Sequence, residues 1–325
     1  MRNTLFCVIA SAIPVLTYSP QATAGIIAPG FDVQVYAPVT DPVNLTFDSA
    51  GNLFVGRDNV GSGGGNSDDV RIHRVGPGGF PVAEYGDSGI FDPDAVVFDA
   101  LGTIAGTPGS VLVGGGTGSN SMARITAILP DETTSILFTA PPMFFSDINQ
   151  MVFDGTGRLL IRDDFNIYAM TGPSLSTRTT LLSFDTVRPT GFAVGENDDI
   201  FVGLTDGTIQ SYSPDGTLIN SSVASGLTRP APLFANGTLF DDGLYALDNG
   251  SFFKVGTSGA TEIATGIDPR SFANFGTDGA LYISEFSNDH VLRMSPVPEP
   301  LSLILIGTGL IILFAHARRH RRLVN

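Results

Sequence analysis

The sequence has little that would build a thiol-based or a helical protein. It contains no Trp and a single cysteine, Cys7, which lies near the N-terminus. One cysteine excludes an intramolecular disulfide, and a chain that loses its first residues also lacks thiolate metal ligands and a cysteine nucleophile. Lysine occurs once, at Lys254, and charged residues make up only 15% of the chain. Long runs of helix-forming residues are absent, whereas short β-branched and aromatic runs separated by Gly, Asp, Asn and Pro favour an all-β fold.

Acidic residues outnumber basic ones by 32 to 17, which gives a formal net charge of −15. Five of the basic residues lie in end segments that we expect to be removed: Arg2, Arg318, Arg319, Arg321 and Arg322. Without them, 12 basic residues face 32 acidic ones, and the formal charge is near −20. Such a surface excludes nucleic acid as a partner, because no basic patch can release phosphate counterions. It is compatible with Ca²⁺ or cationic partners, and it also simply favours solubility.

Residues 1–24 have the pattern of a secretory signal peptide. Arg2 supplies the positive start, and an apolar stretch runs from Leu5 to Leu16. Ala22 and Ala24 form a small-x-small cleavage signal, so Gly25 is the expected N-terminus of the exported protein. A buried N-terminal element is the alternative interpretation.

The C-terminal segment 297–325 has three parts in a fixed order. The motif Pro298-Glu299-Pro300 is followed by an apolar run over 301–315 and then by the four C-terminal arginines. A helix of about 15 residues spans roughly 22 Å, which is short for a bilayer crossing. Arginines after the span would hold the tail in the cytoplasm. We therefore predict a C-terminal transmembrane helix; an ordinary single-pass anchor that carries Pro-Glu-Pro by chance is the alternative to a sorting signal.

This order of motif, span and basic tail resembles the PEP-CTERM sorting signal. The resemblance rests on Pro298, Glu299, Pro300, Arg318, Arg319, Arg321 and Arg322, and it covers about the last 30 residues. It implies an exosortase-type membrane protease as a partner, which removes the tail after a transient stay in the inner membrane. It also implies the envelope, outer surface or extracellular matrix of a Gram-negative bacterium, in association with exopolysaccharide or biofilm. It implies nothing about chemistry.

The body between these ends is repetitive. In four segments, an apolar residue that ends one strand is followed seven positions later by another in the next strand, with Gly and Asp or Asn in the turn. The four pairs are Phe47 and Phe54, Phe153 and Leu160, Val194 and Phe201, and Phe275 and Tyr282. The segment 94–114 fits with extra residues over 101–109, and the segment 229–247 fits with its turn at 241–243. The chain thus has six units.

Each unit can supply four short strands. In the third unit we expect them at Gln150–Asp154, Arg158–Arg162, Ile167–Met170 and Thr179–Phe184. A period of about 40 residues with four strands is typical of propeller blades. The last unit offers three strands, and the segment Asp32–Tyr36 can supply the fourth, which would close the ring. We predict a six-bladed β-propeller over 25–296; five or seven blades, or a pair of β-sandwiches, are the alternatives.

The repeats resemble NHL-type and gluconolactonase-like six-bladed propellers through a recurring Pro-x₃₋₅-Phe-Asp-x-x-Gly-x-Leu-Φ-Val pattern, in which Φ is apolar, clearest over Pro42–Val55. The gluconolactonase-like family holds a divalent cation in the central channel, and its ligands lie five residues before the end of the inner strand. That offset falls on Val43, Asp94, Asn149, Thr190, Ala231 and Ser271. Asp94 and Asn149 are the ligand types that Ca²⁺ or another divalent cation prefers, and the other four are poor ligands or none. Polar residues hydrated by ordinary water are the alternative.

Other catalytic patterns are weaker still. Two of the four histidines, His316 and His320, lie in the tail, and no Gly-x-Ser-x-Gly elbow is present with a plausible histidine partner. The sequence therefore favours a non-catalytic surface or matrix propeller that binds a polysaccharide, a protein or a small ligand. The rival hypothesis is a metal-dependent, lactonase-like hydrolase that uses Asp94 and Asn149. A third hypothesis is a passive structural element of the matrix.

Overall fold

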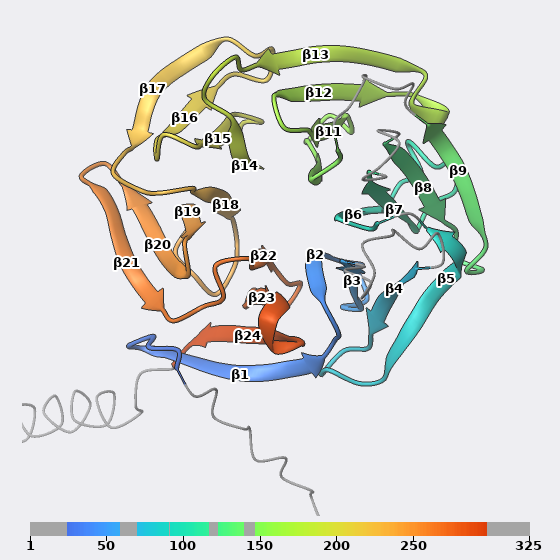
Figure 1. Ribbon diagram of the computed structural model, residues 1–325, viewed down its shortest axis with the longest axis horizontal. Coiled ribbons are helices and arrows are strands. Elements are labelled where there is room, and N and C mark those ends of the chain that lie inside the picture. Colours follow the sequence, from blue (N-terminus) through green and yellow to red (C-terminus); the bar gives the residue numbers. More distant parts are fainter. Residues whose placement is uncertain (1–24, 59–69, 91, 117–122, 140–146, 298–325) are drawn as a thin grey trace, which may run out of the picture.

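The computed structural model describes residues 25–58, 70–90, 92–116, 123–139 and 147–297. In this part of the chain, 24 strands form six four-stranded antiparallel sheets arranged around a central axis (Figure 1). The predicted all-β six-bladed propeller is confirmed. The predicted signal peptide and the C-terminal sorting segment from Pro298 onward lie outside the described residues. Within the described residues, no helix has the length and apolar character that a membrane crossing needs.

Each sheet is one blade, and its strands are numbered from the channel outward. Blade 1 consists of β2 (Pro42–Phe47), β3 (Leu53–Arg57), β4 (Val70–Val75) and β5 (Val82–Ile90). Blade 2 consists of β6 (Ala95–Asp99), β7 (Ser110–Gly115), β8 (Arg124–Ile128) and β9 (Thr134–Thr139). Blade 3 consists of β10 (Gln150–Phe153), β11 (Leu159–Arg162), β12 (Asn166–Thr171) and β13 (Thr177–Ser183). The third blade follows its sequence prediction to within two residues at every strand end.

The second half of the ring repeats this order. Blade 4 consists of β14 (Pro189–Val194), β15 (Ile200–Leu204), β16 (Ile209–Tyr212) and β17 (Leu218–Ala224). Blade 5 consists of β18 (Ala231–Ala235), β19 (Gly243–Asp248), β20 (Ser251–Gly256) and β21 (Gly259–Thr265). Blade 6 is β22 (Phe272–Phe275), β23 (Leu281–Glu285), β24 (His290–Pro296) and β1 (Phe31–Pro38). Two short 3₁₀ helices, η1 (Pro173–Leu175) and η2 (Phe286–Asn288), lie in connections.

The ring is closed by the first strand of the body. Strand β1 pairs antiparallel with β24, from Phe31 opposite Pro296 to Pro38 opposite His290. The pairing that the sequence predicts for Asp32–Tyr36 is therefore the one observed. Upstream of β1, Ile27 exchanges two backbone hydrogen bonds of 3.0 Å with Thr265 at the end of β21, so the same segment also contacts blade 5.

A recurring glycine lets neighbouring blades approach closely. Gly56, Gly114 and Gly203 each lie on the second strand of a blade. A Cβ atom on Gly56 would lie 2.2 Å from the carbonyl oxygen of Pro93, and one on Gly203 would lie 1.8 Å from that of Pro230. Both prolines lie just before the inner strand of the next blade. No side chain fits at such a distance. These glycines therefore let the segment that leads into the next blade lie directly against the second strand.

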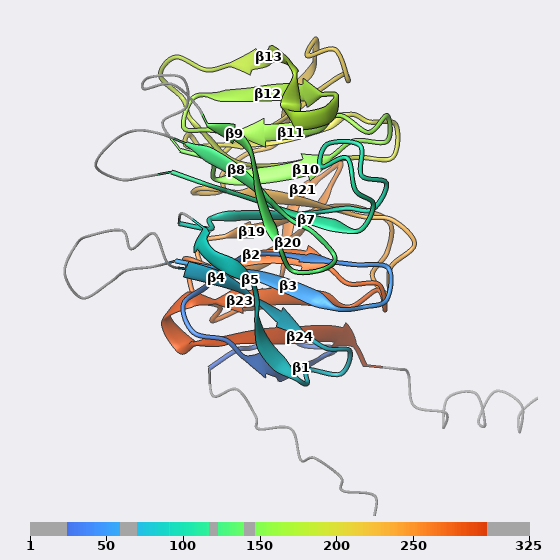
Figure 2. The same ribbon diagram turned by 90° about the vertical axis from the view of Figure 1, so that its right-hand side faces the viewer.

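All six inner strands begin at the same end of the ring, which we call the channel mouth. The β3–β4, β5–β6, β9–β10 and β11–β12 connections lie at this end, and the β2–β3 and β4–β5 turns lie at the other, because successive strands of a blade are antiparallel. Strand β24 ends away from the mouth, and Val297 donates a backbone hydrogen bond to Gly30 there. Figure 2 shows the blades from the side, with β24 beside β1 at one end of the stack.

Candidate metal centre at the channel mouth

The central channel is lined mainly by apolar side chains of the inner strands. Its cavity has a volume of about 190 Å³ and contacts Met151, Phe192, Leu233 and Phe275, among other residues. Several polar side chains on its wall bridge neighbouring blades. The Gln150 amide donates to the Phe192 carbonyl at 2.8 Å and accepts from the Phe192 amide at 3.0 Å. Asn274 Nδ2 likewise donates to the Leu45 carbonyl at 3.2 Å. The wall thus uses its polar groups to hold the ring together.

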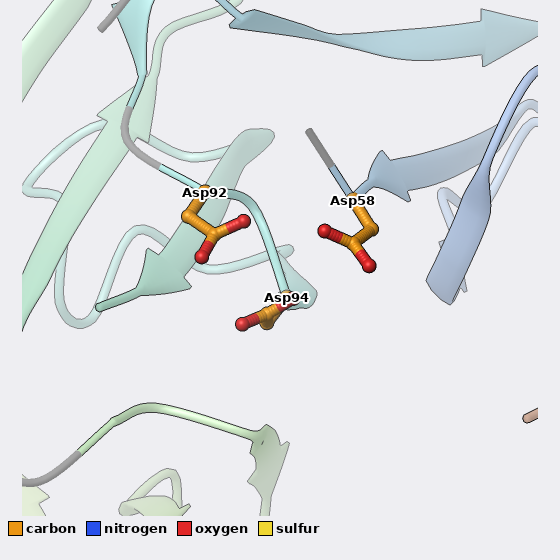
Figure 3. Close-up of side chains that lie close together, drawn as sticks. All are labelled: Asp58, Asp92 and Asp94. Carbon is orange, nitrogen blue, oxygen red and sulfur yellow. The ribbon is translucent and has the colours of Figure 1, made fainter. Parts of the chain in front are cut away.

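At the mouth, three carboxylates gather from two blades. Oxygens of Asp58, Asp92 and Asp94 lie within 4.8 Å of one another, and all three residues are half-buried. Asp58 follows β3 of blade 1, whereas Asp92 and Asp94 lie on the connection that enters β6 of blade 2. Figure 3 shows the carboxylates of Asp58 and Asp92 turned toward the space between the two blades, with Asp94 beside them. We call these three residues the mouth carboxylates.

The local backbone fixes this arrangement. The absence of a side chain at Gly56 allows Pro93 to lie against β3, which brings Asp58 beside the 92–94 segment. The Asp94 amide donates to the Asp92 carbonyl at 2.7 Å, and Asp92 takes a φ of 32° to make this tight turn. The Asp58 amide donates to the Asp41 carbonyl at 3.0 Å. A substitution at Gly56 would therefore displace the mouth carboxylates as well as the blade.

The electrostatics of the cluster disfavour three separate negative charges. Burial, together with the charges of Asp147, Asp92 and Asp58, raises the pKa of Asp94 to about 9. Burial and the charge of Asp41 raise the pKa of Asp58, and the Arg270 guanidinium partly opposes this. Burial also raises the pKa of Asp147. At neutral pH, Asp94 therefore holds a proton or shares its oxygens with a cation.

The mouth carboxylates fit a hard cation. A Ca²⁺ ion binds oxygens at about 2.4 Å, so two of its ligand oxygens lie no more than about 4.8 Å apart. The three carboxylates meet this condition and supply the oxygens that such a cation prefers. Water or a ligand would complete the coordination. The geometry thus supports a divalent cation at the mouth.

The six positions that the sequence singled out have different places in the fold. Asp94, Asn149 and Ser271 directly precede the inner strands β6, β10 and β22, whereas Val43, Thr190 and Ala231 lie inside inner strands. Asn149 Nδ2 and Ser271 Oγ are buried and have no hydrogen-bond partner among the described residues. The Thr190 hydroxyl donates to the Pro230 carbonyl at 2.6 Å, so it is used between blades.

Sequence reasoning missed two of the three mouth carboxylates. Asp58 ends the second strand of its blade, so a rule that counts back from the end of the inner strand cannot reach it. Asp92 is two residues from Asp94, and the run Asp92-Pro93-Asp94 before a strand was the available signal. The structure groups Asp94 with these two residues.

Comparisons with known proteins show the fold. No family model and no curated protein matches the chain. Among solved structures, a virginiamycin B lyase from Staphylococcus aureus is similar over 82% of this chain and 100% of its own, at 12% identity and a TM-score of 0.53. A putative gluconolactonase matches 83% of this chain and 94% of its own (12% identity, TM-score 0.56). The PQQ domain of a pyranose dehydrogenase from Coprinopsis cinerea matches 85% of this chain and 98% of its own (12% identity, TM-score 0.57).

Proposed function

We propose that the chain is an exported, surface- or matrix-associated propeller that binds a ligand at its channel mouth without turning it over, with a divalent cation as part of the site. The single observation that carries this proposal is the set of mouth carboxylates, placed where the inner strands of a closed propeller begin. Propeller and barrel folds offer such concave ends as ligand sites. The absence of a nucleophile motif from the sequence supports binding over catalysis.

A thermal-shift experiment tests the cation. Ca²⁺, Mg²⁺, Mn²⁺ and Zn²⁺ are added in turn at pH 7, and one of them is expected to raise the melting temperature of residues 25–297. A cation at 100 times its Kd stabilises a folded protein by about 2.7 kcal/mol. Asp94→Asn is expected to lose most of this shift, because it removes a charged ligand. Asp131→Asn, at an exposed turn, is the matched control and should keep it. Equal shifts in both variants would refute the site.

A metal-dependent, lactonase-like hydrolase is the second candidate, and the mouth carboxylates favour it too, because such an enzyme needs a cation at the same place. A pH-stat measurement with a sugar lactone distinguishes the two. If the protein hydrolyses the lactone, and if this activity needs the cation and is lost in Asp94→Asn, the function is catalysis and not binding alone. Cation binding without hydrolysis supports the first proposal.

Export and sorting are a separate part of the proposal. The leader 1–24 and the segment 297–325, with its Pro298-Glu299-Pro300 motif, support transient anchoring in the inner membrane and release by an exosortase-type protease. Mass spectrometry of the surface-released protein from a Gram-negative host with such a protease checks this. We expect an N-terminus at Gly25 and a C-terminus near Pro300. A released chain that retains the C-terminal arginines would contradict the sorting signal.

A further inference from the structure

A second concave site lies at the end of the ring opposite the mouth, where blade 1 meets blade 6. Its cavity has a volume of about 370 Å³, within the range of about 300–1,000 Å³ that small-ligand sites occupy. The walls come from three places: β1 supplies Gln34 and Tyr36, the β4–β5 turn supplies Phe80, and blade 6 supplies Asp278, Tyr282 and Arg293. We call it the closure groove, because β1 is the strand that closes the ring.

Phe80 presents an aromatic ring to solvent. It is 59% exposed, and it is the one aromatic side chain among the exposed large apolar side chains of the described residues. The turn that carries Phe80 is held firmly on β1. A Cβ atom on Gly79 would lie 2.1 Å from the Tyr36 carbonyl oxygen, and the Tyr36 hydroxyl donates to the Gly76 carbonyl at 3.2 Å. The ring of Phe80 is therefore exposed on a fixed part of the surface.

The groove also offers hydrogen-bonding groups beside this ring. Arg293 Nη2 and Nε donate to Asp278 Oδ2 at 2.8 and 2.9 Å, so a donor and an acceptor group stand side by side. The Asp278 side chain is 41% exposed. Gln34 has no side-chain hydrogen bond among the described residues, so its amide can both donate and accept. The Tyr282 hydroxyl donates to Asp278 Oδ2 at 3.1 Å and holds that carboxylate in place.

We infer that the closure groove binds a neutral pyranose ring of a saccharide. A pyranose has an apolar face of C–H groups, which packs on an exposed aromatic ring. Its edge carries hydroxyl groups that each donate and accept a hydrogen bond, which matches Gln34 and the Asp278–Arg293 pair. Because Arg293 and Asp278 neutralise each other in a chain of strongly negative charge, the groove favours a neutral sugar over an acidic one.

This site is independent of the channel mouth. The β4–β5 turn lies at the end of the blade where inner strands finish, and the mouth carboxylates lie where they begin. A surface propeller would then contact a cation-dependent ligand with one end of the ring and a saccharide with the other. The two proposals can fail separately, since cation stabilisation and saccharide binding are different measurements.

Saturation-transfer NMR and calorimetry on residues 25–297 test the inference with maltotriose, cellotriose and trigalacturonate. We expect millimolar binding of at least one neutral sugar, with transfer to the C–H face of a ring. Phe80→Ala should weaken it by about tenfold or more, because an aromatic anchor at the centre of a contact contributes strongly. Gln34→Ala should weaken it by less.

Leu101→Ala is the matched control, since Leu101 is 78% exposed in the β6–β7 connection at the same end of blade 2. It should bind the sugars as the unchanged protein does. A circular dichroism spectrum and a melting temperature like those of the unchanged protein show that Phe80→Ala is folded. The inference is overturned if no neutral sugar binds at 10 mM, a concentration of about ten times the expected Kd. It is also overturned if Phe80→Ala and Leu101→Ala bind alike, or if trigalacturonate binds best.

Discussion

A chain that begins at Val39 instead of Gly25 is expected to lose its cooperative unfolding transition. The deletion removes β1, and with it the antiparallel pairing with β24 that runs from Phe31 to Pro38. Blade 6 would keep three strands and expose the edge of β24. An exposed edge of this kind pairs with other chains and leads to aggregation.

The lost contacts are comparable with the whole stability of the domain. Phe31 stacks on Phe240 of blade 5 with ring centroids 5.3 Å apart, and Tyr36 meets Tyr282 edge to face at 4.8 Å. Ala37 is fully buried. A domain is stable by about 5–15 kcal/mol in total, and each net backbone hydrogen bond contributes about 0.5–1.5 kcal/mol. Loss of a whole strand together with its aromatic contacts therefore removes most of the free energy of unfolding.

Circular dichroism during heating measures this effect in three chains. The chain from Gly25 is the reference. The chain from Gly30 loses the bridge between Ile27 and Thr265, the hydrogen bond from the Phe31 amide to the Ala28 carbonyl, and the packing of Ile26 and Ala28, so its melting temperature should fall by a few degrees. The chain from Val39 should show a broad transition or none, and a synthetic peptide of residues 25–38 should restore it. If the chain from Val39 melts like the reference, ring closure contributes little to stability.

The ring was predictable from sequence because its signals are local. Each blade repeats a hairpin whose turn residues, such as those between Phe153 and Leu159, need Gly and Asp whatever surrounds them. The closing strand was predictable by counting, since the last unit lacked one strand and Asp32–Tyr36 was unassigned. Neither inference needs the position of any distant side chain.

The site was less predictable because it depends on contacts between blades. In blades 1 and 4 the inner pairing contains a register shift, between Pro42 and Leu45 and between Pro189 and Gly191. The inner strand therefore starts earlier there, and a fixed offset falls on Val43 and Thr190, inside the strand. A single sequence gives no signal for such a shift. The pairing of Asp58 with Asp94 likewise depends on how closely Pro93 lies against Gly56.

The pH dependence of stability should change sharply in Asp94→Asn. In the folded, metal-free protein, burial and three neighbouring carboxylates raise the pKa of Asp94 from its ordinary 3.8 to about 9. Between these two pH values the folded state holds a proton that the unfolded state has released. Stability therefore falls as the pH rises through this window, and the fall ends above pH 9. Asparagine cannot ionise, so the variant lacks this contribution to the fall.

Melting curves from pH 5 to pH 9 in the presence of a chelator measure the difference. Titrating groups away from the mouth contribute equally to both proteins and cancel in the comparison. From pH 5 to pH 9, the melting temperature of Asp94→Asn relative to that of the unchanged protein should rise by at least about 5 °C. Asp131→Asn is the control: Thr133 lowers the pKa of Asp131, so its contribution is complete well below pH 5 and its curve should run parallel to the reference.

Parallel curves for Asp94→Asn would mean that Asp94 is ionised in the folded protein and that the mouth carries its charges without a cation. A difference in melting temperature that grows with pH would mean that Asp94 is protonated in the folded, metal-free protein. The protein then maintains three carboxylates at a position where ionisation costs stability, and a saturating divalent cation should cancel the loss above neutral pH. Because a cation must displace the proton of Asp94, its apparent affinity should rise with pH up to about 9. The same residue thus links the acid–base behaviour of the mouth to the ligand that it binds.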